Sequence, residues 1–403
     1  MNPERIIERL RELQRLIRDA VVNARAAADL SGVDRAAASD TIYRLDVLIE
    51  PIVVDYCDHW SRELPMVVVA EGIEPETGRC FPAGSDPAAA PVRVIFDPVD
   101  GTRGLMYDKR AAWSLAGVAL NRGEHTRLRD IQAAVMSELP TSKMGRADVL
   151  WAVRGGGAAG VREDLAGGER PLALRPSTAE SIDHGFCSVT DFFPGTKVLA
   201  GELAERIVAG LVGPADVTRA TVFEDQYIST GGQFYELIVG HDRFNADLRP
   251  LFYRMQGQPE GLCCHPYDVC TALVAEEAGV INQVAFVMRY LPAVRQMKTL
   301  VEAGEIGEVL NFRGHMFHSG YLDPNRPMSW RLRHSQSGGG VFADLGSHLV
   351  DLVLYILGGV RAVRAQTRTF ISERPVTKGS PERERVDVDD WALCTLELLS
   401  GAT

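Results

Sequence analysis

The stretch RVIFDPVDGT, residues 93–102, decides the fold and the chemistry that we expect of this chain. Its first four residues predict a strand that ends at Asp97. Pro98 cannot donate to a sheet ladder and forces a turn, which brings Asp100 beside Asp97. Two carboxylates in one tight turn repel each other unless a cation lies between them, and Mg²⁺ takes oxygen ligands of this kind. An isolated Asp-Pro-x-Asp is more often an ordinary turn, but the whole hexapeptide after a strand predicts a metal site.

The two residues that follow suit a phosphate ligand. Gly101 lets the backbone approach a ligand closely, and Thr102 offers a hydroxyl at the expected start of a helix. The N–H groups at a helix N-terminus bind phosphate. We therefore predict phosphate binding at Gly101 and Thr102.

Secondary structure read outward from this stretch alternates between helix and strand. Apolar residues recur at helical spacing over residues 3–29, and a second helix is expected over 34–62. The fold class that this pattern predicts is α/β with several antiparallel strand neighbours. The expected strands are 67–70, 93–96, 113–120, 132–139, 149–154 and 186–189, and a helix is expected over 196–211.

Composition excludes several classes of protein. The 403 residues carry 54 acidic and 43 basic side chains, and this net charge of −11 argues against a general nucleic-acid binder, although a solvated acidic surface explains it equally well. The seven cysteines show no zinc or redox spacing, so we expect free thiols in the cytoplasm. No apolar run of about 18 residues is evident, so no membrane span is expected. The expected partner is a small phosphorylated metabolite, and a homodimer is an open option.

The hexapeptide at 97–102 resembles the D-P-[IV]-D-G-T signature of the inositol monophosphatase-like superfamily, which also contains fructose-1,6-bisphosphatases and nucleotide 3′-phosphatases. The resemblance implies a layered α-β-α-β-α sandwich over residues 1–281, cut short at its C-terminal end. It also implies hydrolysis of a phosphate monoester with two or three Mg²⁺ ions. VVVAEGIE places Glu71 in a metal-ligand position, although Gly72 replaces the second Glu of the family.

Two further segments resemble the same family. RLDVLIEPIV supplies Asp46 and Glu50, four residues apart on one helix face, although alone they are as well explained as a solvated face. HPYDVCTALVAEEAGVI places Asp268 where the family has its last metal-binding Asp, with Tyr267 replacing Trp and Val280 replacing the final Gly.

The resemblance also implies a division of roles. The ions would lie among Glu71, Asp97, Asp100 and Asp268, with help from the Val99 carbonyl and the Thr102 hydroxyl. Metal ions so placed activate a water and stabilise the leaving oxygen. Asp46, Glu71 and Thr102 are the expected catalytic residues, since Thr102 with Asp46 would orient the water. Arg103, Tyr107, Lys109, Arg254 and His265 are weaker candidates for substrate contacts.

The run RGGGAAG, residues 154–160, contains G-x-G-x-x-G. A dinucleotide fingerprint would need a helix to begin there, and the following VREDLAGGERPLALRPS does not read as one. The run is better explained as a glycine turn between two strands. NAD(P) is therefore an unlikely cofactor.

A second resemblance begins at residue 282. VAFVMRYLPAVRQMKTLVEAGEIGEV and SGGGVFADLGSHLVDLVLYILGG are similar to the Gfo/Idh/MocA oxidoreductases of sugars and cyclitols. The resemblance implies that residues 282–403 form part of that family's C-terminal domain, with an open, mainly antiparallel sheet. Asp344 and His348 stand where that family keeps substrate-contacting and catalytic residues. A metal pair and two polar positions of a packed helix are the alternatives. Strands are expected at 282–290 and 311–319.

The two parts join near 281/282, and the chain shows neither the Rossmann fingerprint nor the Glu-Lys-Pro of the second family. We hypothesise a fusion of two unrelated coding regions, in which the segment 280–288 replaces a missing phosphatase strand. Three functions compete: a Mg²⁺-dependent phosphatase, an NAD(P)-dependent oxidoreductase fragment, and a non-catalytic remnant.

Overall fold

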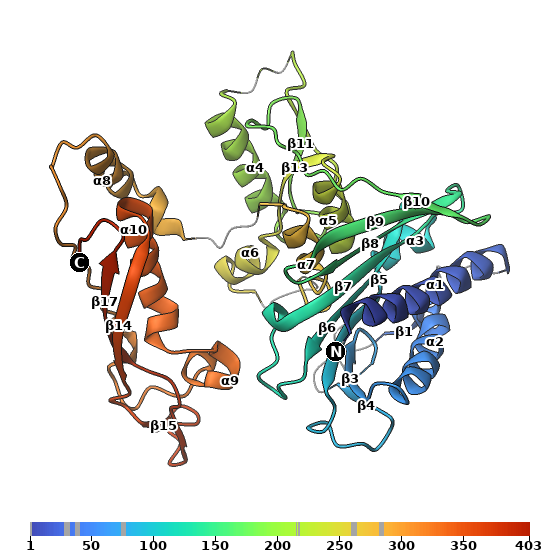
Figure 1. The fold of residues 1–403 in the computed structure, drawn as a ribbon, viewed down its shortest axis with the longest axis horizontal. Helices are drawn as coiled ribbons and strands as arrows, with labels where there is room; N and C mark the ends of the chain where they lie inside the picture. The colour runs from blue at the N-terminus through green and yellow to red at the C-terminus, as the bar shows by residue number, and fades with distance from the viewer. Residues whose placement is uncertain are drawn as a thin grey trace. The chain divides into compact units, whose positions relative to one another are not determined.

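The computed structural model describes residues 2–27, 33–36, 41–73, 78–214, 216, 218–258, 264–281 and 286–403. The chain divides into two compact units, Met1–Asn282 and Gln283–Thr403. Each unit is described by itself, with the elements labelled as in Figure 1.

The first unit is built on an eight-stranded sheet with the order β10-β9-β8-β7-β6-β5-β3-β4. Neighbouring strands pair antiparallel except β3 and β5, which are parallel. The strands expected from the sequence are confirmed to within a few residues. The eight strands are β3 (Met66–Ala70), β4 (Arg79–Phe81), β5 (Val92–Asp100), β6 (Ala112–Leu120), β7 (Ile131–Leu139), β8 (Arg146–Val153), β9 (Gly157–Asp164) and β10 (Glu169–Pro171).

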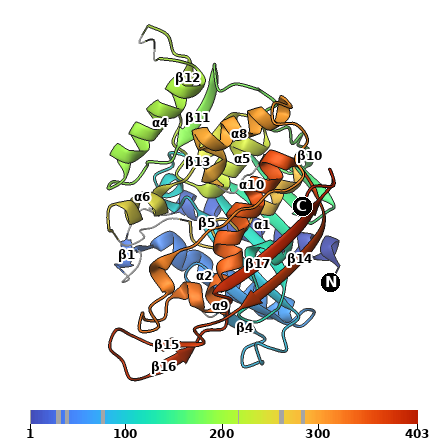
Figure 2. The same ribbon diagram turned by 90° about the vertical axis from the view of Figure 1, so that its left-hand side faces the viewer.

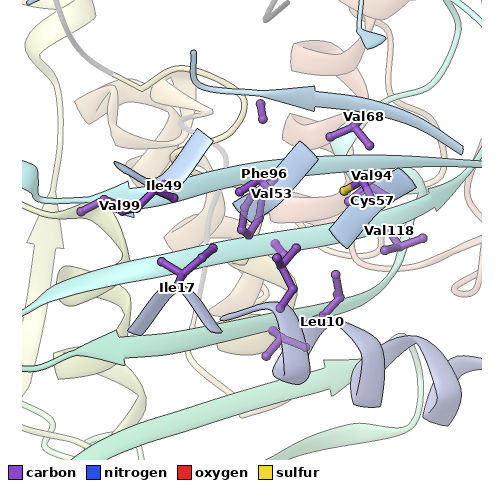
Figure 3. Close-up of a cluster of buried hydrophobic side chains, with 14 of the residues drawn as sticks. Leu10, Ile17, Ile49, Val53, Cys57, Val68, Val94, Phe96, Val99 and Val118 are labelled. Atoms are coloured by element: carbon purple, nitrogen blue, oxygen red, sulfur yellow. The ribbon is translucent and has the colours of Figure 1, made fainter. Parts of the chain in front are cut away.

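Helices α1 (Pro3–Ala27) and α2 (Arg44–Ser61) cover one face of this sheet (Figures 1 and 2). The α1 stripe at spacings of three and four residues is buried, and Figure 3 shows Leu10 and Ile17 of α1 and Val53 of α2 directed at side chains of the strands. Burial on both faces of the sheet explains why β6 is apolar almost throughout.

The predicted start of the second helix was wrong. Residues Val33–Ala36 and Thr41–Tyr43 form the short antiparallel strands β1 and β2, and α2 begins only at Arg44. The sequence Thr-Ile-Tyr is β-branched and aromatic, which favours a strand over a helix.

The opposite face of the large sheet carries α5 (Thr230–Ile238) and α7 (Ala272–Glu277), which pack on Trp113, Leu115 and Met136. Beyond α5 lies a parallel three-stranded sheet with the order β12-β11-β13. Both views place this small sheet between α4 and α5. Its elements and neighbours are β11 (Gly185–Val189), β12 (Val222–Phe223), β13 (Asp242–Ala246), α4 (Lys197–Leu211) and α6 (Arg249–Met255). The first unit is thus α/β, with helices and sheets in alternating layers.

The second unit contains two antiparallel strand pairs, β14 with β17 and β15 with β16. Helix α10 (Ser347–Leu357) follows one π-helical turn at Phe342–Gly346. The remaining elements are α8 (Pro292–Glu302), α9 (His334–Ser337), β14 (Val360–Arg368), β15 (Glu373–Pro375), β16 (Arg383–Arg385), β17 (Trp391–Leu398) and 3-10 turns at Val287–Tyr290, Ser319–Tyr321 and Trp330–Leu332.

Two strands expected in this unit do not form in the part of the chain that is described. Residues Val287–Tyr290 form a 3-10 turn, because the Arg289 N–H donates to the Phe286 carbonyl at 3.2 Å within the same segment. The Arg289 side chain donates to both oxygens of the buried Asp351 carboxylate of α10. Residues 311–318 form no strand, although Phe312 N–H donates to the Thr403 carbonyl at 2.9 Å. The described residues of 280–288 likewise form no strand, so they give no support to the idea of a replacement strand; residues 282–285 lie outside the description.

One helical stretch within the described residues, His334–Leu357, is long and apolar enough to cross a membrane, with a mean hydropathy of 1.5 in its best window. The sequence reading overlooked it because Asp344, His348 and Asp351 interrupt the apolar residues. A core helix of a folded domain passes the same test of length and composition, and Leu352, Val353 and Ile356 of this stretch are buried.

Candidate active site

A β-bulge directs Asp97 and Asp100 toward the same region. In a regular strand, residues three apart point to opposite faces. Here Asp97 pairs with Leu115 and Asp100 pairs with Trp113, so three steps along β5 match two along β6. The extra residue lies at Pro98–Val99, where Pro98 has no N–H to lose and Val99 N–H donates to Asp97 Oδ1 at 3.0 Å. The bulge therefore reverses the alternation of the strand between the two carboxylates.

Glu71 reaches the same edge from the neighbouring strand. β3 runs parallel to β5 with Ala70 opposite Phe96, and Glu71 N–H donates to the Phe96 carbonyl at 3.2 Å. The carboxyl ends of parallel strands meet at one edge, so Glu71 and Asp97 leave the sheet together. Burial, followed by the charges of Glu71, Asp100 and Asp268, raises the pKa of Asp97 well above its ordinary value.

The N-terminus of α5 holds Asp100. Its Oδ2 accepts hydrogen bonds from Ser229 Oγ at 2.8 Å and from Gly231 N–H at 2.6 Å. Ser229 also caps the helix, because its Oγ accepts from Gly232 N–H at 2.9 Å. Burial raises the pKa of Asp100 to about 7, while the bond from Gly231 opposes that rise.

Asp268 comes from the turn that precedes α7. Its Oδ2 accepts from His265 N–H at 2.7 Å, which fixes the carboxylate at the start of that turn. Asp268 and six other residues predicted for the metal and phosphate sites line one cavity of about 100 Å³. The six are Glu71, Asp97, Val99, Asp100, Gly101 and Thr102.

The Gly101-Thr102 turn is closely packed. Gly101 has φ +96°, and a Cβ there would lie 3.0 Å from the Ile228 carbonyl oxygen. Both the conformation and the space therefore require glycine. Thr102 begins α3 (Thr102–Met106), and its Oγ1 donates to the Val99 carbonyl at 2.8 Å. The proton of the Thr102 hydroxyl is thus committed to the backbone, and its oxygen is left to accept.

Other predicted site residues lie elsewhere. The side chain of Asp46 is outside the described residues, and Glu50 is exposed on α2 and does not line the cavity. Arg103 and His265 line the cavity, whereas Tyr107, Lys109 and Arg254 do not.

Sequence reasoning missed the remaining lining residues, namely Phe192, Phe193, Ile228, Ser229, Thr230, Arg249 and Tyr267. Ser-Thr-Gly-Gly, residues 229–232, carries a signal that could have found some of them, since Ser before a helix is a typical N-cap. Nothing in the local pattern marks Phe192, Phe193 or Arg249.

The donor chemistry of the cavity fits a hard divalent cation. Carboxylates of Glu71, Asp97, Asp100 and Asp268 and the Val99 carbonyl supply only oxygen. Among the described residues, no three His, Cys, Asp or Glu side chains lie close enough together to enclose an ion as they stand. Burial is the largest cause that raises the pKa values of Asp97 and Asp100, and neighbouring carboxylates add to it, so a cation would favour the ionised form of both.

The glycine turn at 154–160 is bound by a carboxylate of the chain itself. Gly155 N–H donates to Glu277 Oε1 at 2.6 Å and Gly157 N–H to Glu277 Oε2 at 2.9 Å. The turn joins the antiparallel strands β8 and β9, as predicted, and no helix begins there. These contacts fasten α7, and with it the turn of Asp268, to the large sheet.

The second unit holds the remaining pair of candidates. Asp344 lies in the π-helical turn, 3.5 Å from the Arg331 guanidinium. The His348 ring meets Phe286 edge-on at 5.5 Å, and its buried Nδ1 has no hydrogen-bond partner among the described residues. Asp344 and His348 thus lie on one helical stretch, and their described side-chain contacts are with other residues, Arg331 and Phe286.

Comparison with known proteins finds a family model that matches the C-terminal part of the chain. Residues 294–403 match the family described as "GFO/IDH/MocA C-terminal domain", which confirms the resemblance seen around Asp344 and His348.

Particular relatives share this region. The chain is 34% identical over 138 residues to levoglucosan dehydrogenase of Pseudarthrobacter phenanthrenivorans, a match that covers 32% of this chain and 35% of the relative. It is 32% identical over 127 residues to scyllo-inositol 2-dehydrogenase (NAD(+)) of Bacillus subtilis, covering 32% and 33%. The chain therefore spans about a third of the length of these relatives. Among solved structures, the Leishmania major fructose-1,6-bisphosphatase is 16% identical, with 68% of this chain and 80% of that chain covered and a TM-score of 0.46.

Proposed function

We propose that the first unit hydrolyses a small phosphate monoester with the help of Mg²⁺. One observation carries the proposal: Glu71, Asp97, Asp100 and Asp268, from three separate places in the sequence, line one cavity. Clustered and buried carboxylates are unfavourable unless a cation neutralises them. Phosphate esters are substrates that metal ions held by carboxylates bind and activate.

Glu71, Asp97, Asp100, Asp268 and the Val99 carbonyl would hold two or three ions. When bound, such ions polarise the phosphoryl group and lower the pKa of water. In the proposed reaction, water attacks the phosphate directly, and no phosphorylated form of the protein is required.

The chain itself orients the reactants. Because the Thr102 hydroxyl donates to the Val99 carbonyl, its oxygen accepts a hydrogen bond from the attacking water and fixes that water's orientation. Asp46 would take part in the same task, as the sequence predicts. The backbone N–H groups of Gly101 and Thr102 would hold the phosphate, whose approach the absence of a side chain at Gly101 permits.

Phosphate release by the full chain tests the proposal, measured with and without Mg²⁺ on inositol phosphates, fructose bisphosphate and adenosine 3′,5′-bisphosphate. Asp97→Asn should lower the rate by at least about 100-fold, the upper end of losses caused by residues that only support a metal ligand. Asp58→Asn, an exposed position on α2, is the matched control and should keep full activity. Full activity in Asp97→Asn would rule out the metal site.

The match of residues 294–403 favours a second candidate, an oxidoreductase of sugars or cyclitols that uses NAD(P). Asp344 and His348 would act on its substrate. NADH fluorescence titrated with the full chain tests it, and no change in emission would end this reading. A chain with neither activity would be a non-catalytic remnant. Action in the cytoplasm and assembly as a homodimer stay proposals.

A further inference from the structure

Four of the residues that line the cavity carry aromatic rings. Phe192 and Phe193 follow β11 and meet edge to face, with ring centroids 5.0 Å apart and planes at 82°. His265 and Tyr267 precede α7 and lie nearly parallel, 5.1 Å apart at 13°. His265 is exposed and Tyr267 half-buried. Two ring pairs from distant parts of the chain thus line the same cavity as the four carboxylates.

Two arginines support the phenylalanine pair. Arg249 Cζ lies 4.3 Å from the Phe192 centroid, and its Nε donates to Asp247 Oδ1 at 2.9 Å. Because Arg249 is only 3% exposed and is ion-paired, it supports the ring more than it attracts a ligand. Arg103 Cζ lies 5.4 Å from the Phe193 centroid, one residue after Thr102. Arg103 therefore places positive charge beside the expected phosphate position.

A cyclitol or sugar would find few hydrogen-bond partners among the described lining residues. Each hydroxyl taken from water needs a hydrogen-bond partner, and a desolvated hydroxyl without one is unfavourable. The described lining contains no Asn, Gln or Lys, its acidic side chains are the four expected to hold metal, and the hydroxyls of Thr102 and Ser229 are already hydrogen-bonded within the protein. Thr230, His265 and Tyr267 are the other uncharged polar side chains of this lining, fewer than the hydroxyls of a cyclitol phosphate. A planar ring, in contrast, stacks on aromatic side chains and needs few polar partners.

We infer that the substrate is a phosphate monoester whose leaving group carries a planar aromatic ring, as a nucleoside does. This inference rests on the proposed function of the cavity. In the reaction, the water oxygen bonds to phosphorus and the ester P–O bond breaks. The leaving alcohol keeps the oxygen and gains a proton, and inorganic phosphate is released.

Steady-state kinetics in Mg²⁺ test the inference by comparing kcat/KM for 3′-AMP and 5′-AMP with kcat/KM for inositol 1-phosphate and glucose 6-phosphate. We expect at least one nucleotide to be preferred by about tenfold or more, as base stacking on an aromatic side chain contributes. Tyr267→Leu and Phe193→Leu should lower this preference, whereas Tyr267→Phe, which keeps the ring, should retain it. Tyr107→Leu is the matched control, since Tyr107 is an exposed aromatic residue outside the lining.

Calorimetric titration of 3′-AMP and inositol 1-phosphate into the wild-type chain with Mg²⁺ separates this inference from the proposed function. Binding of the nucleotide without hydrolysis of any ester supports the ligand class and rejects the phosphatase. Preference for inositol 1-phosphate in rate supports the phosphatase and overturns the inference. Equal losses for all substrates in the leucine variants also overturn it, because the rings would then be merely structural. Neither binding nor hydrolysis rejects both.

Discussion

Gly231 is the residue through which the packing of α5 and the position of Asp100 depend on each other. A Cβ at Gly231 would lie 2.5 Å from Leu115 Cδ2 and 2.9 Å from Trp113 Cβ, both of them in the buried core. Its N–H is also a donor to Asp100. The helix can therefore approach the carboxylate this closely only with glycine at this position.

Gly231→Ala should accordingly lower the free energy of unfolding by about 1–3 kcal/mol, the usual effect of overpacking. Urea denaturation measures the change. Gly201→Ala in α4 is the control, because a Cβ there meets nothing within 4 Å and alanine favours the helix. A loss no larger than that of the control would contradict the packing described here.

Glu138 is a half-buried carboxylate on β7 whose Oε2 accepts from Asp148 N–H at 3.1 Å. Burial is the main cause that raises its pKa from 4.5 to about 7. An acid with a raised pKa in the folded state favours folding when protonated, so its contribution is lost as the pH rises from about 4.5 to about 7. Glu138→Gln keeps an acceptor oxygen but cannot ionise.

This variant should therefore be more stable than the wild type by about 1–3 kcal/mol at pH 8, with a much smaller difference at pH 5. Thermal unfolding at the two pH values gives the comparison. The same difference at both values would show that ionisation of Glu138 has no effect on stability.

Among the elements, the bulge of β5 shows what sequence could and could not predict. The strand, the turn and the carboxylates at 97 and 100 follow from local pattern, because Pro98 and the flanking apolar residues are neighbours in sequence. The contacts of Asp100 with Ser229 and Gly231 join residues some 130 positions apart, and no local signal links them. The same holds for Phe192, Phe193 and Arg249. In the second unit, the described part of the strand expected at 282–290 contains a 3-10 turn at Val287–Tyr290 instead, and no local signal links Arg289 to its distant ion-pair partner Asp351.

The β8–β9 turn and α7 are joined through Glu277, which accepts from two backbone N–H groups. Glu277→Ala should lower the free energy of unfolding by about 1–3 kcal/mol, because both donors lose a charged acceptor. Amide hydrogen exchange at residues 155–157 should become faster as well. Glu276→Ala is the matched neighbour, since Glu276 is exposed and its contact with Arg154 is a long one of 3.4 Å. Equal changes in unfolding free energy and in amide exchange for the two variants would contradict the proposal that Glu277 fastens α7 to the β8–β9 turn.

For the whole molecule, the proposals assign different chemistry to the two units. The first unit holds the carboxylate cavity, and the second contains the residues that match the GFO/IDH/MocA C-terminal domain. The sequence signalled both parts through short motifs, DPVDGT in one and GSHLVDL in the other. A ligand that binds the folded first unit will stabilise that unit.

Scanning calorimetry of the wild type and of Asp97→Asn, each with and without Mg²⁺, tests the central claim most directly. The claim predicts that Mg²⁺ raises an unfolding midpoint of the wild type. Without Mg²⁺, Asp97→Asn should unfold at a higher temperature than the wild type, because the substitution removes one of the mutually repelling charges. Addition of Mg²⁺ should raise the unfolding midpoint of this variant only slightly. A wild type indifferent to Mg²⁺, or a variant that gains as much as the wild type, would contradict the assignment of Glu71, Asp97, Asp100 and Asp268 as a metal site.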